Sequence, residues 1–408
     1  MKNRQNNWQK IKLGDAAGEV RNLYNPSPGE HLKYIGLEHI KQNTLRLSSI
    51  GDSADTQSAK KFFSTNDVLF GSLRAYFRKV VKPKFNGVCS TDITVLRSKN
   101  GNDQNFLYYF IANPHFIDFA AASAEGTRMP RVSWKFLSKT QWNFPPSADQ
   151  KRISDILSAF DDKIELNNKI SKNLEQTAQV VFKEWFIKFK YPGHEKVKMV
   201  DSELGKIPVG WGVKKFFEIA HLNRGVSYSS KEISAKEGGL PMINLANFLR
   251  GGGFNSSGVK HYTGVYKDSH LVKPGQIIIA MTDLTSNREV IGHPARVPED
   301  FSKALISLDV CSINTEDIYV EFLYSLMLRR SFSQLMAGSA SGTNVSHLNK
   351  TNIEEYLLIL PSRDLLPKFN KLIRPMFTQQ INLSAENQKL TALRDLLLPK
   401  LMSGGIRI

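Results

Sequence analysis

The sequence predicts an α+β protein in which two similar α/β domains are separated by two long antiparallel helices, in a pseudo-two-fold arrangement. Two observations predict this organisation. The motifs of the first half recur in the same order in the second half, and each half ends in a long stretch of apolar residues at heptad spacing. The boundaries that follow are 1–146 for the first domain, 147–196 for the first helix, 197–361 for the second domain and 362–408 for the second helix.

The duplication rests on an ordered series of short matches. Each half opens on a tryptophan, Trp8 and Trp211, followed by a β-prone run. Further pairs follow in the same order along both halves: 34–37 with 242–245, 66–71 with 274–279, 106–108 with 322–324, 126–127 with 342–343, and Pro145 with Pro361. Such a series is expected for two copies that differ by loop insertions.

Within each half, the pattern predicts short strands and one helix. Runs of Val, Ile and Leu between turn residues predict strands at 68–70, 93–96, 277–280 and 308–313. Aromatic and apolar residues near helical spacing predict helices at 104–122 and 317–336. A polar loop follows each helix, at 124–131 and 339–346.

The first long helix is predicted to begin at a capping box formed by Ser147 and Gln150. No glycine or proline occurs between Ser147 and Tyr191, so about 40 residues would form a helix of roughly 60 Å. A helix of this length needs a partner helix to cover its apolar seam.

The second long helix is interrupted by Pro367, Pro375 and Pro399. Because a proline in a helix interior costs about 3 kcal/mol or kinks the helix, we expect its continuous part to run from 376 to 398. We favour antiparallel pairing of the two helices; the alternative is two unrelated amphipathic helices that each cap their own domain. The residues predicted to pack between the helices are Ile153, Leu157, Phe160, Ile164, Leu174, Trp185, Ile373, Leu383, Leu390 and Leu397.

The charge of the chain points to a polyanionic partner. There are 55 Lys and Arg against 38 Asp and Glu, which gives a formal net charge of +17. Nucleic acid is the commonest polyanion; solubility charge and an anionic membrane surface are the alternatives. No apolar run approaches the roughly 20 residues of a membrane span, and the N-terminus lacks a secretory signal. With its two cysteines, Cys89 and Cys311, expected in cores, we expect the chain in the cytoplasm.

Known catalytic motifs are missing from the sequence. It contains neither a Gly-x-Gly-x-x-Gly element after a strand nor a phosphate-binding loop, and its nine histidines lack zinc-ligand spacing. We therefore expect a binding module without catalytic residues, metal or cofactor of its own.

Three segments resemble the specificity (S) subunits of type I restriction–modification enzymes. Residues 201–211, Asp-Ser-Glu-Leu-Gly-Lys-Ile-Pro-Val-Gly-Trp, resemble the lead-in to the second target-recognition domain of those subunits. Residues 182–186, Phe-Lys-Glu-Trp-Phe, resemble the end of their central helix, and residues 393–404 resemble their C-terminal helix. The resemblance covers essentially the whole chain, although the first half lacks the lead-in and starts almost directly at Trp8.

This resemblance implies a function in which each domain is a target-recognition domain that reads one half of a bipartite DNA site. The helices would set the length of the unread spacer. The implied partners are double-stranded DNA, two methylation (M) subunits and restriction (R) subunits, without a membrane. S-adenosylmethionine, ATP and Mg are expected on those partner subunits, so this chain would supply specificity and catalyse nothing.

The residues that would contact DNA are expected in the segments after the strands at 68–70 and 277–280 and in the two polar loops. Lys and Arg would bind phosphates, while Arg suits guanine and Asn suits adenine through paired hydrogen bonds. The predicted contacts are Arg74, Tyr76, Arg78, Lys79, Arg128, Arg131, Thr282, Asn287, Arg288, Asn344, Ser346 and His347. For each of them the alternative is an ordinary solvated loop residue.

Other functions stay open at this point. One is a coiled-coil scaffold or adaptor protein without sequence-specific DNA binding, and another is an enzyme with an unrecognised site. A third is the S subunit of a related system, in which the partner fuses methylase and nuclease.

Overall fold

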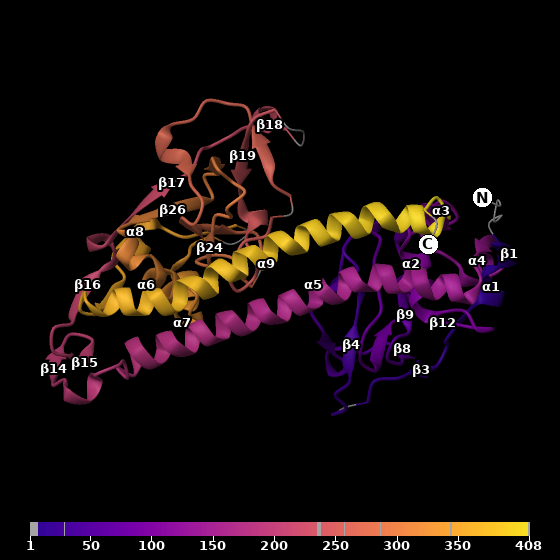
Figure 1. The fold of residues 1–408 in the computed structure, drawn as a ribbon, viewed down its shortest axis with the longest axis horizontal. Coiled ribbons are helices and arrows are strands. Elements are labelled where there is room, and N and C mark those ends of the chain that lie inside the picture. The colour runs from indigo at the N-terminus through magenta and orange to yellow at the C-terminus, as the bar shows by residue number, and fades with distance from the viewer. Residues whose placement is uncertain are drawn as a thin grey trace, which may run out of the picture. The chain divides into compact units, whose positions relative to one another are not determined.

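The computed structural model of the protein describes residues 7–27, 29–234, 238–256, 258–285, 287–342 and 345–406. The chain forms two compact units, which are Met1–Leu166 with Glu386–Ile408, and Asn167–Ala385. Two long helices, α5 (Ser147–Phe182) and α9 (Leu365–Met402), are each continuous in Figure 1 and contribute one segment to either unit.

The first unit contains two main sheets. An antiparallel sheet has the strand order β10 (Val80–Val81), β9 (Val68–Gly71), β12 (Ile93–Ser98) and β2 (Ala17–Glu19). A second sheet has the order β3 (Leu23–Tyr24), β8 (Lys60–Phe63), β11 (Gly87–Ser90), β4 (Lys33–Ile35) and β7 (Gly51–Asp52), in which only β11 and β4 are parallel. A short ribbon pairs β5 (Ile40–Lys41) with β6 (Arg46–Leu47). The strands predicted at 68–70 and 93–96 are confirmed.

Alternation along the central strands builds a core of three layers. On β9, Val68 and Phe70 belong to the core shared with the helices, whereas Leu69 belongs to the core between the two sheets. On β12, Leu96 belongs to the core shared with the helices, and Val95 belongs to the core between the two sheets. Successive strand residues point to opposite faces, so a strand covered on both faces appears in the sequence as an unbroken apolar run.

The single helix predicted in each half is wrong, because each is two helices. In the first unit α2 (Gln104–Ala112) ends before α3 (Pro114–Ala122), and Asn113 between them is extended, with φ −61° and ψ 129°. A residue before proline is pushed out of the helical region, which accounts for the break. In the second unit α6 (Asp317–Met327) and α7 (Arg330–Ser339) are separated at Arg329, which is also extended.

The second unit repeats this topology. Its antiparallel sheet has the order β17 (Ala220–Arg224), β26 (Val310–Thr315), β22 (Ile277–Ala280) and β24 (Pro294–Arg296). Its other sheet has the order β21 (Leu271–Val272), β25 (Ala304–Ile306), β19 (Leu240–Ile243), β20 (Lys260–Tyr262) and β18 (Ile233–Ser234), and β25 and β19 are parallel like β11 and β4. The edge strand of this second sheet differs between the units: β3 extends the sheet beside β8, whereas β18 extends it at the opposite edge, beside β20.

Equivalent strand pairs also frame each domain. In the first unit β1 (Gln9–Lys12) pairs with β13 (Gln141–Phe144), and in the second β16 (Gly212–Lys215) pairs with β28 (Leu357–Leu360). The short helices are α1 (Leu13–Ala16), α4 (Trp134–Leu137) and α8 (Lys350–Glu354). The 201–211 segment lies in a hairpin of β14 (Met199–Ser202) and β15 (Gly205–Pro208). Pairing with β13 anchors β1, although the first domain lacks that lead-in.

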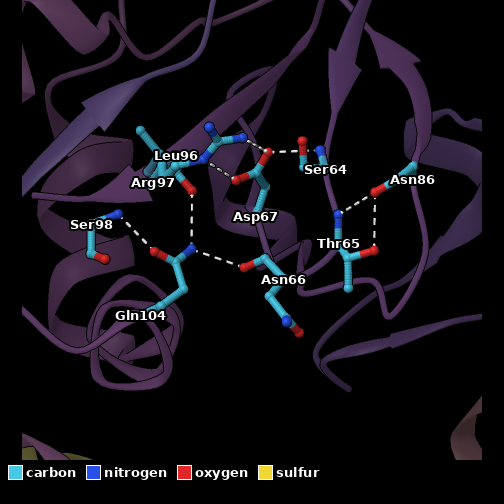
Figure 2. Close-up of polar contacts among 9 residues, drawn as sticks. All are labelled: Ser64, Thr65, Asn66, Asp67, Asn86, Leu96, Arg97, Ser98 and Gln104. Atoms are coloured by element: carbon cyan, nitrogen blue, oxygen red, sulfur yellow. Dashed lines mark hydrogen bonds and ion pairs between the residues drawn. The ribbon is translucent and has the colours of Figure 1, made fainter.

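Figure 2 shows the turn that leads into β9 in the first unit. The Asp67 carboxylate accepts a hydrogen bond from the Ser64 backbone N–H (2.8 Å) and forms a two-pronged ion pair with Arg97 (2.8 Å for each prong). The Gln104 side-chain amide donates to the backbone oxygens of Asn66 and Leu96. These bonds fix the start of the central strand, and thereby the direction of the loop at its other end.

The second unit builds the same turn from different side chains. Gln276 accepts from the Lys273 backbone N–H (3.1 Å) and donates to Asn314 (2.8 Å), in place of the ion pair. The residue before it has a left-handed backbone in both units, with φ 70° at Asn66 and 75° at Gly275. The structure therefore aligns 66–71 with 275–280, one residue beyond the match drawn from sequence.

The start of α5 at Ser147 is confirmed, but the capping box is wrong. The Ser147 hydroxyl donates to the Gly101 carbonyl oxygen (3.0 Å), and the Gln150 side-chain oxygen accepts from the Asp103 backbone N–H (2.9 Å). Both side chains therefore bind the turn at 101–103 instead of the first turn of the helix, and these hydrogen bonds fix the start of α5 to the domain.

The expectation that prolines shorten the second helix is also wrong, since α9 continues from Leu365 to Met402. Pro367 lies in the first turn, where a backbone N–H has no partner within the helix. Pro375 removes one interior hydrogen bond, which the packing of the surrounding turns offsets: Phe369, Ile373 and Phe377 are all buried.

Segments of α5 and α9 pack antiparallel within each unit. In the first unit, Leu157 shares a core with Leu398, and the Arg394 guanidinium binds the Asp161 carboxylate (2.6 Å). In the second unit, the Gln380 amide donates to the Ser171 carbonyl oxygen (2.8 Å), and the rings of Phe182 and Phe369 are in contact. Of the residues predicted to pack between the helices, the structure buries Ile153, Leu157, Ile164, Ile373 and Leu383 and half-buries Phe160, Leu174, Trp185, Leu390 and Leu397.

Candidate nucleic-acid interface

The two segments predicted to contact a partner in the first unit lie side by side. The loop that follows β9 forms a bridge from Leu73 to Arg131, and the Arg74 backbone N–H donates to the Pro130 carbonyl oxygen (2.8 Å). The Val132 backbone N–H donates to Ser72 (3.0 Å). Residues far apart in sequence are thus joined into one surface at the end of the central strand.

The side chains of this surface divide into exposed and engaged groups. Tyr76 and Arg128 are exposed. Arg131 is exposed but donates to the Asp92 carboxylate (2.9 Å). Arg78 pairs with Asp118 (3.0 Å), and the Lys79 ammonium donates to the Leu37 carbonyl oxygen (2.6 Å), so both are held by the protein.

Three basic residues beside this surface were missed from sequence. Arg131 lines a hollow together with Arg21, Lys61 and Lys135. Arg21 follows β2, Lys61 lies on β8, and both pair with Glu19. Lone cations at separate positions give no sequence signal, because only the sheet brings them together.

The second unit joins its two predicted segments by a strand pair. β23 (Thr282–Asp283) follows β22 and pairs antiparallel with β27 (Ser346–His347). Thr282 and Ser346 are buried, and the Thr282 hydroxyl donates to the Asp309 carboxylate (3.0 Å). These two side chains therefore serve the framework, while Asn287 and His347 are exposed. Asn344 lies outside the described residues.

Asp283 organises the loop that carries Asn287 and Arg288. Its side chain is 3% exposed and accepts hydrogen bonds from the backbone N–H groups of Thr285 (2.7 Å), Val290 (2.6 Å) and Ile291 (3.0 Å). Burial by itself would raise the pKa of this carboxyl, but these donors lower it below its ordinary value. The sequence did not identify Asp283, because its carboxylate accepts four hydrogen bonds from residues up to eight positions further along the chain.

Arg288 crosses from the same loop to the second segment. Its Nε donates to the Ser346 hydroxyl (3.0 Å), and its Nη1 donates to the Ala337 carbonyl oxygen (2.5 Å). The guanidinium is half-buried. Its hydrogen bonds thus hold the two segments of the second unit together.

Equivalent positions of the two units carry different chemistry. The bridge from Leu73 to Arg131 corresponds to the pairing of Thr282 with His347. One unit therefore presents an arginine where the other presents a histidine. Two surfaces of one architecture but different side chains are suited to recognise two different ligand sequences.

A family model described as Type I restriction modification DNA specificity domain matches residues 5–176 and 208–391. The chain belongs to this family. The Type I restriction enzyme HindI specificity subunit of Haemophilus influenzae is 25% identical over 98% of this chain and 99% of that protein. The Type I restriction enzyme MjaIX specificity subunit of Methanocaldococcus jannaschii is 27% identical over 76% of this chain and 71% of that protein.

A solved structure supports the fold of this specificity-domain protein. The S subunit of a Type-I restriction-modification system from M. genitalium covers 98% of this chain and 97% of its own, with a TM-score of 0.56 and 17% identity. Each of the two stretches matched by the family model contains one structural repeat and part of a long helix, so each specificity domain contains one pair of joined segments.

Two kinds of feature are absent from the described residues. No helix there is long and apolar enough to cross a membrane. No group of three or more His, Cys, Asp or Glu side chains there is arranged to hold a metal ion.

Proposed function

We propose that this chain is the specificity subunit of a type I restriction–modification complex, in which each domain reads one half of a bipartite DNA site. The observation that carries the proposal is the pair of joined segments, built on the same topology in both units but with different exposed side chains. Membership of the specificity-domain family supports it.

The charge and the exposed cations support double-stranded DNA as the ligand. A formal net charge of +17 favours the phosphate backbone, and the hollow around Arg131 gathers four basic side chains, three of which pair with Glu19 or Asp92. Phosphate contacts would position the duplex, and exposed side chains such as Tyr76, Arg128, Asn287 and His347 would reach base edges. The individual contacts are proposals, residue by residue.

The long helices and the partner subunits complete the proposal. α5 and α9 would set the unread spacer between half-sites, and two methylation subunits and restriction subunits would bind the assembly. S-adenosylmethionine, ATP and Mg would act on those subunits, and the present chain would not be catalytic. The buried free cysteines Cys89 and Cys311 are compatible with a reducing cytoplasm.

The decisive experiment is recovery of the methylated motif from DNA exposed to the complex of this chain with its methylation subunits. We expect one asymmetric motif with two specific parts and an unspecified spacer. Replacing residues 1–146 by the first domain of another family member should then change one part only. A motif altered in both parts, or in neither, would contradict modular reading.

A coiled-coil scaffold without sequence-specific DNA binding is not favoured, because the family model covers both domains as well as parts of the helices. It predicts that the complex shows no preference between duplexes of different sequence, which the same motif recovery measures.

A further inference from the structure

Three arginines in the joined segments have an unusual backbone. One of them, Arg78 (φ 52°), pairs with Asp118, and the other two bind the other segment of their unit. Arg74 has φ 51° and Arg288 has φ 52°, both in the left-handed region. This conformation costs roughly 1–2 kcal/mol for a residue with a Cβ, so the surrounding structure must hold it. Each of the two residues lies in the segment that follows the central strand of its unit.

Both side chains cross to the other segment of the same unit. The Arg74 Nη2 donates to the carbonyl oxygen of Arg128 (3.2 Å). Arg288 binds the Ser346 hydroxyl and the Ala337 carbonyl oxygen, at 3.0 and 2.5 Å. The two arginines do not occupy equivalent positions, since Arg74 aligns with Asp283, yet each unit uses one arginine for the same connection.

This connection restricts what the Arg288 guanidinium can read. Recognition of guanine uses two N–H groups of one edge at once. Because Nε is bonded to Ser346, the edge formed by Nε and Nη2 is not free to bind a base without breaking a partly buried hydrogen bond. Asn287, the preceding residue in the chain, is exposed instead.

We propose that Arg74 and Arg288 are positioning residues that hold the two recognition segments of each domain together, and that Arg288 does not read bases itself. The role of these arginines in DNA binding rests on the proposed function, whereas the hydrogen bonds that join the segments do not depend on it. In the second domain, the hydrogen bonds of Arg288 would hold residues such as Asn287 and His347 in position against DNA.

The first test needs no DNA. Hydrogen exchange of the full chain is compared between wild type and Arg288→Lys, which keeps the charge but cannot donate two bonds in the same directions. We expect faster exchange in both 287–292 and 345–348, although only the first contains the substitution. Unchanged exchange in 345–348 would contradict the proposal that Arg288 holds the two segments together. This test does not depend on whether the protein reads a DNA motif.

The second test uses the complex with methylation subunits and a duplex that carries the motif recovered from the wild type. We expect Arg288→Lys and Arg288→Gln each to weaken binding to this duplex by the same factor, on the order of tenfold. The factor should stay the same on duplexes that carry any single-base-pair change in the second half-site. A base reader would relax preference at one base pair. If Arg288 instead bound a phosphate, the Lys variant would keep that contact and the Gln variant would lose it. The slope of log affinity against log salt concentration would then fall by about 1 in the Gln variant.

Three further variants keep the inference falsifiable if Arg288→Gln folds poorly. Ser346→Ala should weaken binding less than Arg288→Lys does, and the double variant should be no weaker than Arg288→Lys alone, because both changes remove the same connection. Arg74→Lys should affect only the first half-site. Additive losses in the double variant would contradict the proposal.

Discussion

At the scale of the residue, buried polar side chains decide the shape of the recognition surface. Asp283 is the clearest case, because one carboxylate holds three backbone N–H groups and the Thr285 hydroxyl. The sequence shows only an aspartate after an apolar strand. Its partners become visible when the loop folds back, since no local spacing identifies which backbone groups lack other acceptors.

Asp283→Asn is expected to destabilise the second unit by about 2 kcal/mol, because an amide leaves buried backbone donors unsatisfied. The lowered folded-state pKa means that this stabilisation is present above the unfolded pKa of about 3.9 and is lost as the pH falls through the lower folded value. Urea unfolding at pH 7 and pH 3 measures both effects, and the difference between variant and wild type should shrink at pH 3.

The exposed Asp300 offers a matched control for this change. Asp300→Asn should leave the urea midpoint within error at both pH values. Equal losses in the two variants would show that the Asp283 hydrogen bonds do not matter.

At the scale of the element, the paired helices combine a predictable seam with polar contacts that sequence did not assign. Arg394 is 1% exposed and binds Asp161 across the helix pair and Asp395 on its own helix, contacts that no sequence pattern predicts. Burial would lower the pKa of Arg394, whereas the two carboxylates raise it, and the net shift is upward. The arginine therefore stays charged inside the core of the first unit.

Asp161→Asn is expected to cost about 3 kcal/mol, because it leaves a buried guanidinium poorly compensated. Urea unfolding of the first unit measures the loss, and adding Arg394→Met should recover a large part of it. The neighbouring Asp162, which pairs with Lys84 at the surface, is the control. Asp162→Asn should change stability by less than about 1 kcal/mol, and a similar cost at both positions would contradict the role of the buried pair.

The prolines of α9 provide another comparison at this scale. Pro375→Ala should stabilise the second unit by about 1–2 kcal/mol, because it restores an interior hydrogen bond against a smaller gain in unfolded-chain entropy. Pro367→Ala, in the first turn, should give no gain. Thermal unfolding of the two variants distinguishes them, and an equal response would mean that position in the helix is irrelevant.

At the scale of the whole molecule, duplication and charge are the dominant features. Two units whose four-stranded sheets have the same strand order place a joined pair of segments at the end of equivalent strands. The net charge of +17 makes binding to DNA strongly dependent on salt.

We expect the affinity of the complex for its duplex to fall by about a thousandfold between 50 and 200 mM salt, as for six or more phosphate contacts. Fluorescence anisotropy with a labelled duplex measures the slope. A duplex of unrelated sequence should bind more weakly with a similar slope, and affinity that does not change with salt would contradict the proposed electrostatic contribution.

The sequence by itself determined the duplication, the central strands and the presence of two long helices, but not the extent of the second one. Those features depend on local periodicity and on repeated order along the chain, which one sequence displays directly. It also located the segments of the candidate site, around Arg74, Arg128, Arg288 and Ser346.

Only the tertiary structure decided which of those residues face outward and which hold the fold. Thr282 and Ser346 are buried, Arg288 joins two segments, and Asp283 orders a loop, because partners distant in the chain compete for each polar group. The same competition redirected Ser147 and Gln150 and let α9 continue through Pro375. Hydrogen bonding and burial depend on the whole fold, so a local pattern fixes where a side chain occurs but not what it binds.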